Sequence, residues 1–75
     1  MNYVCIIGIL VEKNNSFLII NTGFELIKVF IDNDIDINIL DINSPIKIEG
    51  KVTKLGFPFE VVLAEKIYTI KEDVQ

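Results

Sequence analysis

Short runs of β-branched and aromatic residues, separated by turn residues, are the feature that most constrains how this chain can fold. Isoleucine, valine and phenylalanine favour strands, because their side chains are restricted in a helix and pack well on a pleated sheet. Asparagine, glycine, serine and proline interrupt these runs at short intervals. The pattern predicts five strands, at residues 3–13, 17–22, 24–32, 46–55 and 59–70. We expect the 75 residues to form a single domain, 1–75.

Alternation within these segments predicts which side chains face the core. In the third segment one side carries Glu25, Ile27, Val29 and Ile31, and the opposite side carries Leu26, Lys28, Phe30 and Asp32. In the fourth segment the inward row is Ile46, Ile48 and Val52, and the outward row is Lys47, Glu49 and Lys51. The first segment has a second apolar row, Cys5, Ile7, Ile9 and Val11, beside its core row.

Residues 33–44 fit two patterns. Isoleucines in this segment are spaced for a helical stripe and equally for a strand, and its aspartates and asparagines are mediocre helix formers. We expect at most one or two helical turns, with Asp32 or Asp34 as the N-cap, ending before Pro45. Five strands with one short helical turn between the third and fourth predict an all-β, five-stranded Greek-key barrel of the OB-fold kind.

The chain carries much apolar surface for its size. Hydrophobic residues make up 51% of it and the mean hydropathy is +0.47, yet a domain this small buries only about 60% of its unfolded surface. No apolar run approaches the ~18 residues of a spanning helix, and no signal peptide is recognisable. We therefore expect a cytoplasmic homo-oligomer, a homodimer or homotetramer. Cys5 is the only cysteine, which excludes an internal disulfide and fits a reducing compartment.

Four segments carry a family resemblance. The first pattern, N-x-V-x-L-x-G-x-L, is matched by Asn2, Val4, Ile6, Gly8 and Leu10. The patterns of later strands are matched in order by ELIKV (25–29), SPIKIEGKV (44–52) and VLAEKIYTI (62–70). Asn43 stands where the second of these later patterns begins with a glycine. The chain thus resembles the OB core of bacterial single-stranded DNA-binding proteins. The primosomal replication protein, which shares this fold, is a second candidate relative. The resemblance implies DNA binding in replication and a first strand that takes part in dimer contacts.

The chain also departs from this family. Leu26 stands where the family has a base-stacking tryptophan, although the following basic position is kept as Lys28. The hairpin between the fourth and fifth strands shrinks to roughly residues 54–58, and we expect a form without the family's acidic tail. Seven lysines face eleven acidic residues, for a net charge of −4. Phosphate binding relies on clustered cations, so the charge offers no global steering toward DNA.

Single-strand binding by an OB barrel needs aromatic faces for base stacking and cations along the backbone. Phe30 shares a predicted face with Lys28, and two phenylalanines flank Pro58 with lysines nearby. The candidate nucleic-acid-binding residues are Lys28, Phe30, Lys51, Lys54, Phe57 and Phe59. Each phenylalanine has an alternative role in the barrel or at a subunit interface. By register with the family, Phe17 is expected to face the core.

Other chemistry has little support in the sequence. Histidine is absent, and GKVTKLG lacks the order of a phosphate-binding loop. Asp32, Asp34 and Asp36 begin like a calcium loop, but Ile37 replaces the required glycine. We expect no enzyme activity, no cofactor and no metal. Two hypotheses stay open: binding of single-stranded DNA or RNA by an oligomer, or an OB-fold protein-interaction module that has lost nucleic-acid binding.

Overall fold

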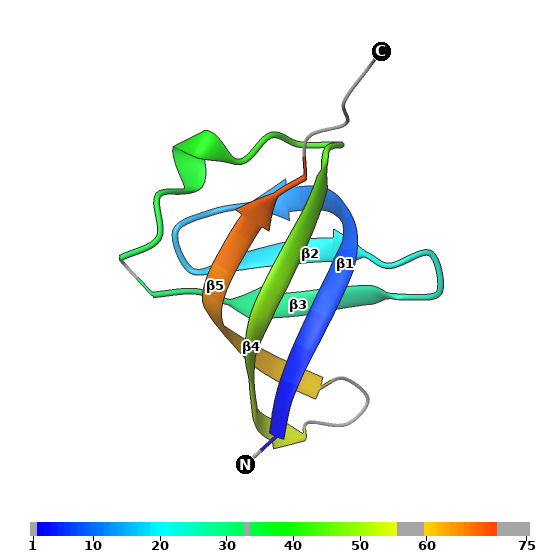
Figure 1. Cartoon of the computed structure of the whole chain (residues 1–75), viewed down its shortest axis with the longest axis vertical. Helices are drawn as coiled ribbons and strands as arrows, with labels where there is room; N and C mark the ends of the chain where they lie inside the picture. The colour runs from blue at the N-terminus through cyan, green and yellow to red at the C-terminus, as the bar shows by residue number, and fades with distance from the viewer. Residues whose placement is uncertain (1, 33, 56–59, 71–75) are drawn as a thin grey trace.

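The computed structural model of the chain describes residues 2–32, 34–55 and 60–70. These residues form five strands and one short 3₁₀ helix, η1 (Figure 1). The elements are β1 (Asn2–Lys13), β2 (Phe17–Asn21), β3 (Leu26–Phe30), η1 (Ile37–Ile39), β4 (Pro45–Leu55) and β5 (Glu60–Thr69). The predicted strands therefore lie within about two residues of the observed ones. No helix in the described ranges has the length and apolar character that crossing a bilayer needs.

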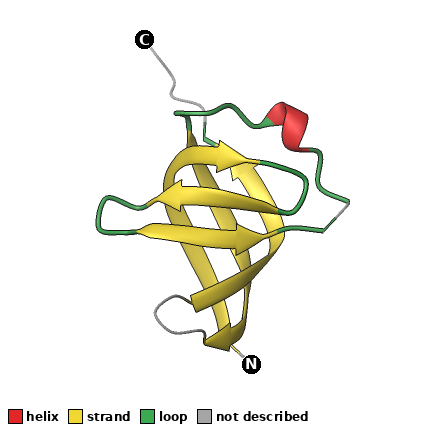
Figure 2. Cartoon of the chain, turned by 180° about the vertical axis from the view of Figure 1, so that it is seen from behind, coloured by secondary structure: helices red, strands yellow, loops and turns green. Residues whose placement is uncertain are grey.

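The five strands close into a barrel in the order β1-β2-β3-β5-β4. All neighbours are antiparallel except β3 and β5, which are parallel. β1, β4 and β5 lie on one side of the barrel, and the β2–β3 hairpin crosses them on the other (Figures 1 and 2). This is the five-stranded Greek-key arrangement of the OB fold, as predicted.

β1 closes the barrel because it pairs with two neighbours in succession. Its residues Asn2–Ile9 pair with β4, and Ile9–Lys13 pair with β2, with a bulge between Leu10 and Glu12. Gly8 lies where β1 passes from one partner to the other. A Cβ there would meet the Asn21 carbonyl oxygen and lie 2.7 Å from Cγ2 of Ile20. Glycine is required at this position because the two backbones approach so closely.

The core contains the inward rows that alternation predicts. Its buried residues come from every strand and from the loop before β4: Ile6, Leu10, Leu18, Ile20, Val29, Ile31, Leu40, Ile46, Ile48 and Ala64. Val4, Ile27, Ile35, Ile37 and Ile67 pack against them. The predicted alternation is confirmed for Ile46 and Ile48, which are buried, and for the lysines of β3 and β4, which point outward, whereas Val52 is half-buried and is not among the core residues.

The connection between β3 and β4 contains one helical turn, as expected. The N-cap is Asp36, whose carboxylate accepts a hydrogen bond from the Asn38 N–H at 3.0 Å, so the prediction of Asp32 or Asp34 is wrong. The connection returns to the barrel at Asn43, which has a φ of 70° and donates its N–H to the Leu10 carbonyl. Asparagine is one of the few residues besides glycine that adopts this left-handed conformation readily.

Candidate nucleic-acid interface

The outward face of the β2–β3 hairpin carries aromatic, apolar and cationic side chains. Since Leu18, Ile20 and Val29 point into the core, their neighbours point outward. The outward residues are Phe17, Ile19 and Asn21 from β2 and Leu26, Lys28 and Phe30 from β3. Lys28 and Phe30, two of the predicted site residues, therefore lie together on the outside of the barrel.

Phe17, Phe30 and Lys28 form one contact group, which we call the aromatic–lysine cluster. Phe17 and Phe30 occupy directly paired positions, and their rings meet edge to face with centroids 6.4 Å apart. The Lys28 ammonium lies 4.4 Å from the Phe17 ring centroid and 5.8 Å from that of Phe30. A cation this close to an aromatic face is attracted by the ring quadrupole. The cluster therefore presents two half-buried rings and one positive charge to solvent.

The structure corrects the expectation that Phe17 faces the core. Phe17 is half-buried on the outer face and is not among the core residues, whereas Leu18 and Ile20 are fully buried. One signal in the sequence could have revealed this. Asn21 shares the row of Phe17 at period two and is exposed, which marks that row as the outer one.

Lys51 lies on the same outer surface, two strands away from the cluster. Register positions place five outward residues side by side across the strands: Phe17 on β2, Phe30 on β3, Leu63 on β5, Lys51 on β4 and Tyr3 on β1. We call these five residues the cross-strand row. The Lys51 ammonium lies 5.4 Å from the Tyr3 ring centroid. The row thus has an aromatic ring at each end, with Leu63 and Lys51 in its interior, and Lys28 lies beside its Phe17–Phe30 end.

The side chains of three predicted site residues lie outside the described part of the structure. Lys54 belongs to β4 and pairs with Val61, but its side chain lies outside the described residues. Phe57 and Phe59 fall in residues 56–59, which are also outside the described ranges. The described part of the candidate interface therefore consists of Lys28, Phe30 and Lys51, and Phe17, Leu63 and Tyr3 lie next to them in register.

The sequence matches no protein-family model, no curated protein and no solved structure.

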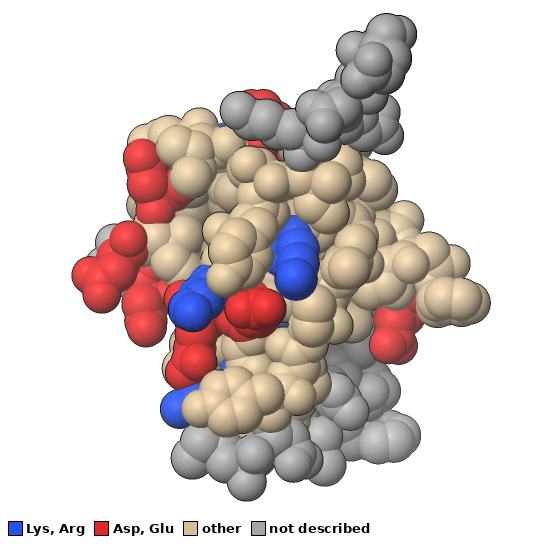
Figure 3. Space-filling view, in the orientation of Figure 1, with Lys and Arg blue, Asp and Glu red and all other residues tan. Residues whose placement is uncertain are grey.

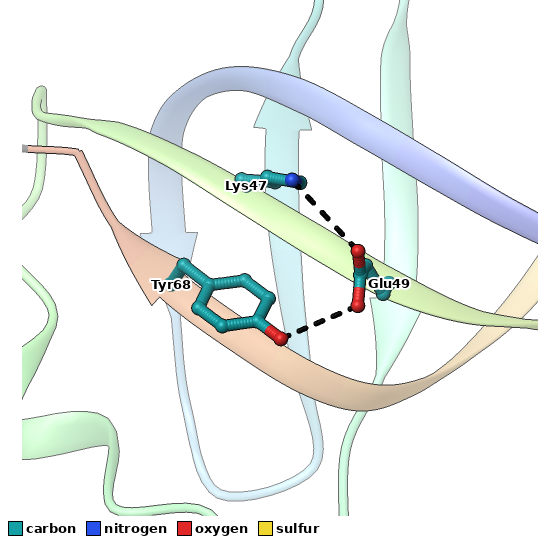
Figure 4. Close-up of polar contacts among 3 residues, drawn as sticks. All are labelled: Lys47, Glu49 and Tyr68. Carbon is teal, nitrogen blue, oxygen red and sulfur yellow. Dashed lines mark hydrogen bonds and ion pairs between the residues drawn. The ribbon is translucent and has the colours of Figure 1, made fainter.

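Charges near the cross-strand row are mixed. On the outer face of β4 and β5 the Tyr68 hydroxyl donates to Glu49 at 3.3 Å, and the Lys47 ammonium lies 3.8 Å from the same carboxylate (Figure 4). Lysine and acidic side chains lie next to one another on this face (Figure 3). Lys28 differs, since it forms no ion pair with any described carboxylate.

The loop after β3 has the opposite character. Asp32, Asp34, Asp36 and Asp41 are all exposed in the connection between β3 and β4. Among the described residues no three acidic or cysteine side chains are grouped to hold a metal ion. These carboxylates repel an anionic ligand from this end of the barrel. A ligand on the aromatic–lysine cluster is thus favoured to extend along the cross-strand row rather than over the loop.

Proposed function

We propose that this chain is a non-enzymatic protein that binds single-stranded nucleic acid on the outer face of the β2–β3 hairpin. The observation that supports this most is the aromatic–lysine cluster, in which a lysine without a described carboxylate partner lies over two outward aromatic rings. OB-fold barrels bind oligonucleotides on their strand 2–3 face. Base stacking on aromatic rings tolerates every sequence, and the cation contacts the backbone.

The same surface suggests weak binding by each barrel. Alanine substitution of a stacking aromatic typically costs ~1–3 kcal/mol per base, and the cluster offers two rings and one ammonium. The net charge of −4 gives no long-range attraction to phosphate. Several linked barrels would raise the overall affinity without any new contact. The proposal therefore includes an oligomer.

A fluorescence titration with labelled oligo-dT of about 15 nucleotides tests the function. Phe17→Leu and Phe30→Leu keep an apolar side chain but remove the ring, so the barrel stays folded while stacking is lost. We expect each to weaken binding by about fivefold or more, which is the lower end of what stacking contributes. Phe24→Leu is the matched control, because Phe24 is 98% exposed in the hairpin connection and outside the cluster. Its affinity should stay within about twofold of the wild type.

Lys28→Met tests the cationic part of the site. Each phosphate neutralised on a single strand contributes a slope of about −0.7 to log affinity against log salt. Removing Lys28 should therefore weaken binding at low salt and make the slope shallower by about 0.7. Absence of any binding by the wild type at low salt and high micromolar protein would exclude the proposed function.

The outer row of β1 supports the oligomer. Cys5, Ile7, Ile9 and Val11 are all exposed, and this row is apolar. In the same stretch, Asn2–Gly8 pairs with β4 on one side and with no described strand on the other. An apolar row beside an open strand edge is a surface that another chain can cover. We propose a homodimer through this surface, in the cytoplasm, where a lone cysteine stays reduced.

Mass measurement in solution tests the dimer. Ile7→Glu places a charge in the β1 row, where Ile7 is 58% exposed, and should convert the dimer to a monomer. Ile39→Glu is the matched control, since Ile39 is 63% exposed in η1, away from β1. If the wild type is a monomer at working concentration, the dimer is excluded. The apolar row of β1 then favours the alternative function, a protein-interaction module.

A further inference from the structure

Lys51 forms an ion pair with Glu65 of the same chain. Its ammonium lies 3.2 Å from Oε2 of Glu65, and the two side chains are 28% and 42% exposed. The same ammonium is 5.4 Å from the Tyr3 ring centroid. Lys51 is therefore partly accessible, between Leu63 and Tyr3 in the cross-strand row, but the Glu65 carboxylate already holds the position that a phosphate would take.

A β-bulge explains why Glu65 points at Lys51. The β4–β5 register runs from Glu49↔Lys66 to Gly50↔Ala64, so Glu65 is the extra residue without a partner. Ala64 is buried, while Glu65 and Lys66 are both exposed. A bulge changes the direction in which a side chain points. Gly50 permits this one, because a Cβ there would meet the Leu63 carbonyl oxygen. The carboxylate is thus positioned by backbone geometry rather than by chance rotation of a surface side chain.

We propose that the Glu65 carboxylate competes with single-stranded DNA for the Lys51 ammonium. When DNA binds along the cross-strand row, one of its phosphates displaces the Glu65 carboxylate and contacts Lys51. This inference rests on the proposed function and extends the site from the β2–β3 hairpin to β4. Lys51 is two strands from Phe30 in register, which corresponds to about 10 Å. A DNA strand whose bases stack on Phe17 and Phe30 reaches Lys51 by passing over Leu63. This path leads away from the aspartates in the loop after β3.

The pKa of Lys51 reflects its ion pair with Glu65. The hydrogen bond from Lys51 to Glu65 and the negative charge of that carboxylate raise the pKa of Lys51 above its ordinary value of 10.5, and Tyr3 acts in the same direction. A phosphate offers the same charge and the same acceptor oxygens as a carboxylate. The exchange therefore keeps the ammonium paired, and its cost is the release of Glu65 to solvent.

A double-mutant cycle on the full chain tests this inference. Oligo-dT affinity is measured at low salt for the wild type, Glu65→Gln, Lys51→Met and the variant that combines both. Glu65→Gln should bind about two- to fivefold more tightly, the range that an exposed ion pair contributes. Asp41→Asn is the matched control, because it removes the same charge from the exposed loop before β4, whereas Lys51 lies in the second half of that strand.

The outcomes separate this inference from the proposed function. The inference is supported if Glu65→Gln raises the affinity for oligo-dT, while Asp41→Asn does not and Glu65→Gln has no effect in the Lys51→Met background. Equal gains in Glu65→Gln and Asp41→Asn would reduce the effect to net charge and overturn the inference while oligo-dT binding stands. A gain that survives in the Lys51→Met background, or no gain at all, overturns it as well. If the wild type binds no oligo-dT, the proposed function itself fails.

Discussion

Lys13 should stabilise the barrel more than any other described lysine. It is the last residue of β1, and its ammonium donates to two carbonyl oxygens of the loop before β4: Leu40 at 2.6 Å and Ile37 at 3.2 Å. Leu40 is fully buried in the core. Replacing Lys13 with methionine keeps the apolar stem and removes both hydrogen bonds, so within the described ranges the loop stays bonded to β1 only through the backbone of Leu10.

The loss of stability in Lys13→Met depends on what happens to the two carbonyl groups that accept from Lys13. The Ile37 carbonyl also accepts the Leu40 N–H at 3.1 Å, so it keeps a partner in the variant. Among the described residues, the Leu40 carbonyl accepts only from Lys13. A hydrogen bond to a charged group contributes about 1.5–3 kcal/mol. We expect a loss of about 1–2 kcal/mol, because Lys13 is only half-buried and water replaces part of the interaction.

Urea and thermal unfolding followed by circular dichroism measure this loss. For a domain of this size, about 1–2 kcal/mol lowers Tm by roughly 4–16 °C. The urea midpoint should fall without a change in m, since the barrel and its buried surface are the same. Lys66→Met is the matched control, because Lys66 is exposed on β5 and makes no described ion pair. Equal stability of the Lys13→Met and Lys66→Met variants would refute the reasoning.

Three further predictions follow from the backbone and from Lys51. Gly50→Ala should cost about 1–3 kcal/mol in urea unfolding, because its Cβ meets the Leu63 carbonyl oxygen; an unchanged midpoint would show that the bulge relaxes freely. Asn43→Val should cost about 1–2 kcal/mol at its φ of 70°, while Asn43→Gly stays within a few tenths, and equal costs would contradict the left-handed backbone. The raised pKa of Lys51 stabilises the folded chain below pH 10.5, and this contribution disappears as pH rises through the raised value. Alkaline unfolding of Glu65→Gln should therefore depend less on pH than that of the wild type.

The sequence predicts most of this fold because local preference and tertiary structure agree. Lys47, Glu49 and Lys51 alternate with apolar residues in β4, so the inward face is unambiguous. The loop before β4 was harder to predict, because its isoleucines suit two periodicities. In the structure the choice is made by contacts that are distant in sequence: Leu40 enters the core, and Lys13 binds the loop from β1.

The site was predictable only in part. Alternation predicts that Lys28 and Phe30 share one face, which is confirmed, and the structure places that face on the outside of the barrel. Alternation did not pair them with Phe17, because the β2–β3 register depends on a turn in which Asn21 and Thr22 side chains hold the backbone N–H groups of Gly23, Phe24 and Glu25. The Lys51–Glu65 contact was hidden because a bulge shifts β5 by one residue, and a regular strand would have placed Glu65 at a paired position.

The central claim is that one outward surface of the barrel receives a nucleic-acid strand, and mapping by NMR tests it most directly. Amide shifts of the labelled protein would be followed while oligo-dT is added at low salt. We expect saturable shifts concentrated at Phe17, Lys28, Phe30, Leu63 and Lys51, with little change at Asp34, Asp36 or Asp41. Shifts confined to the loop before β4 or to the outer row of β1, or no shifts at saturating oligo-dT, would contradict it.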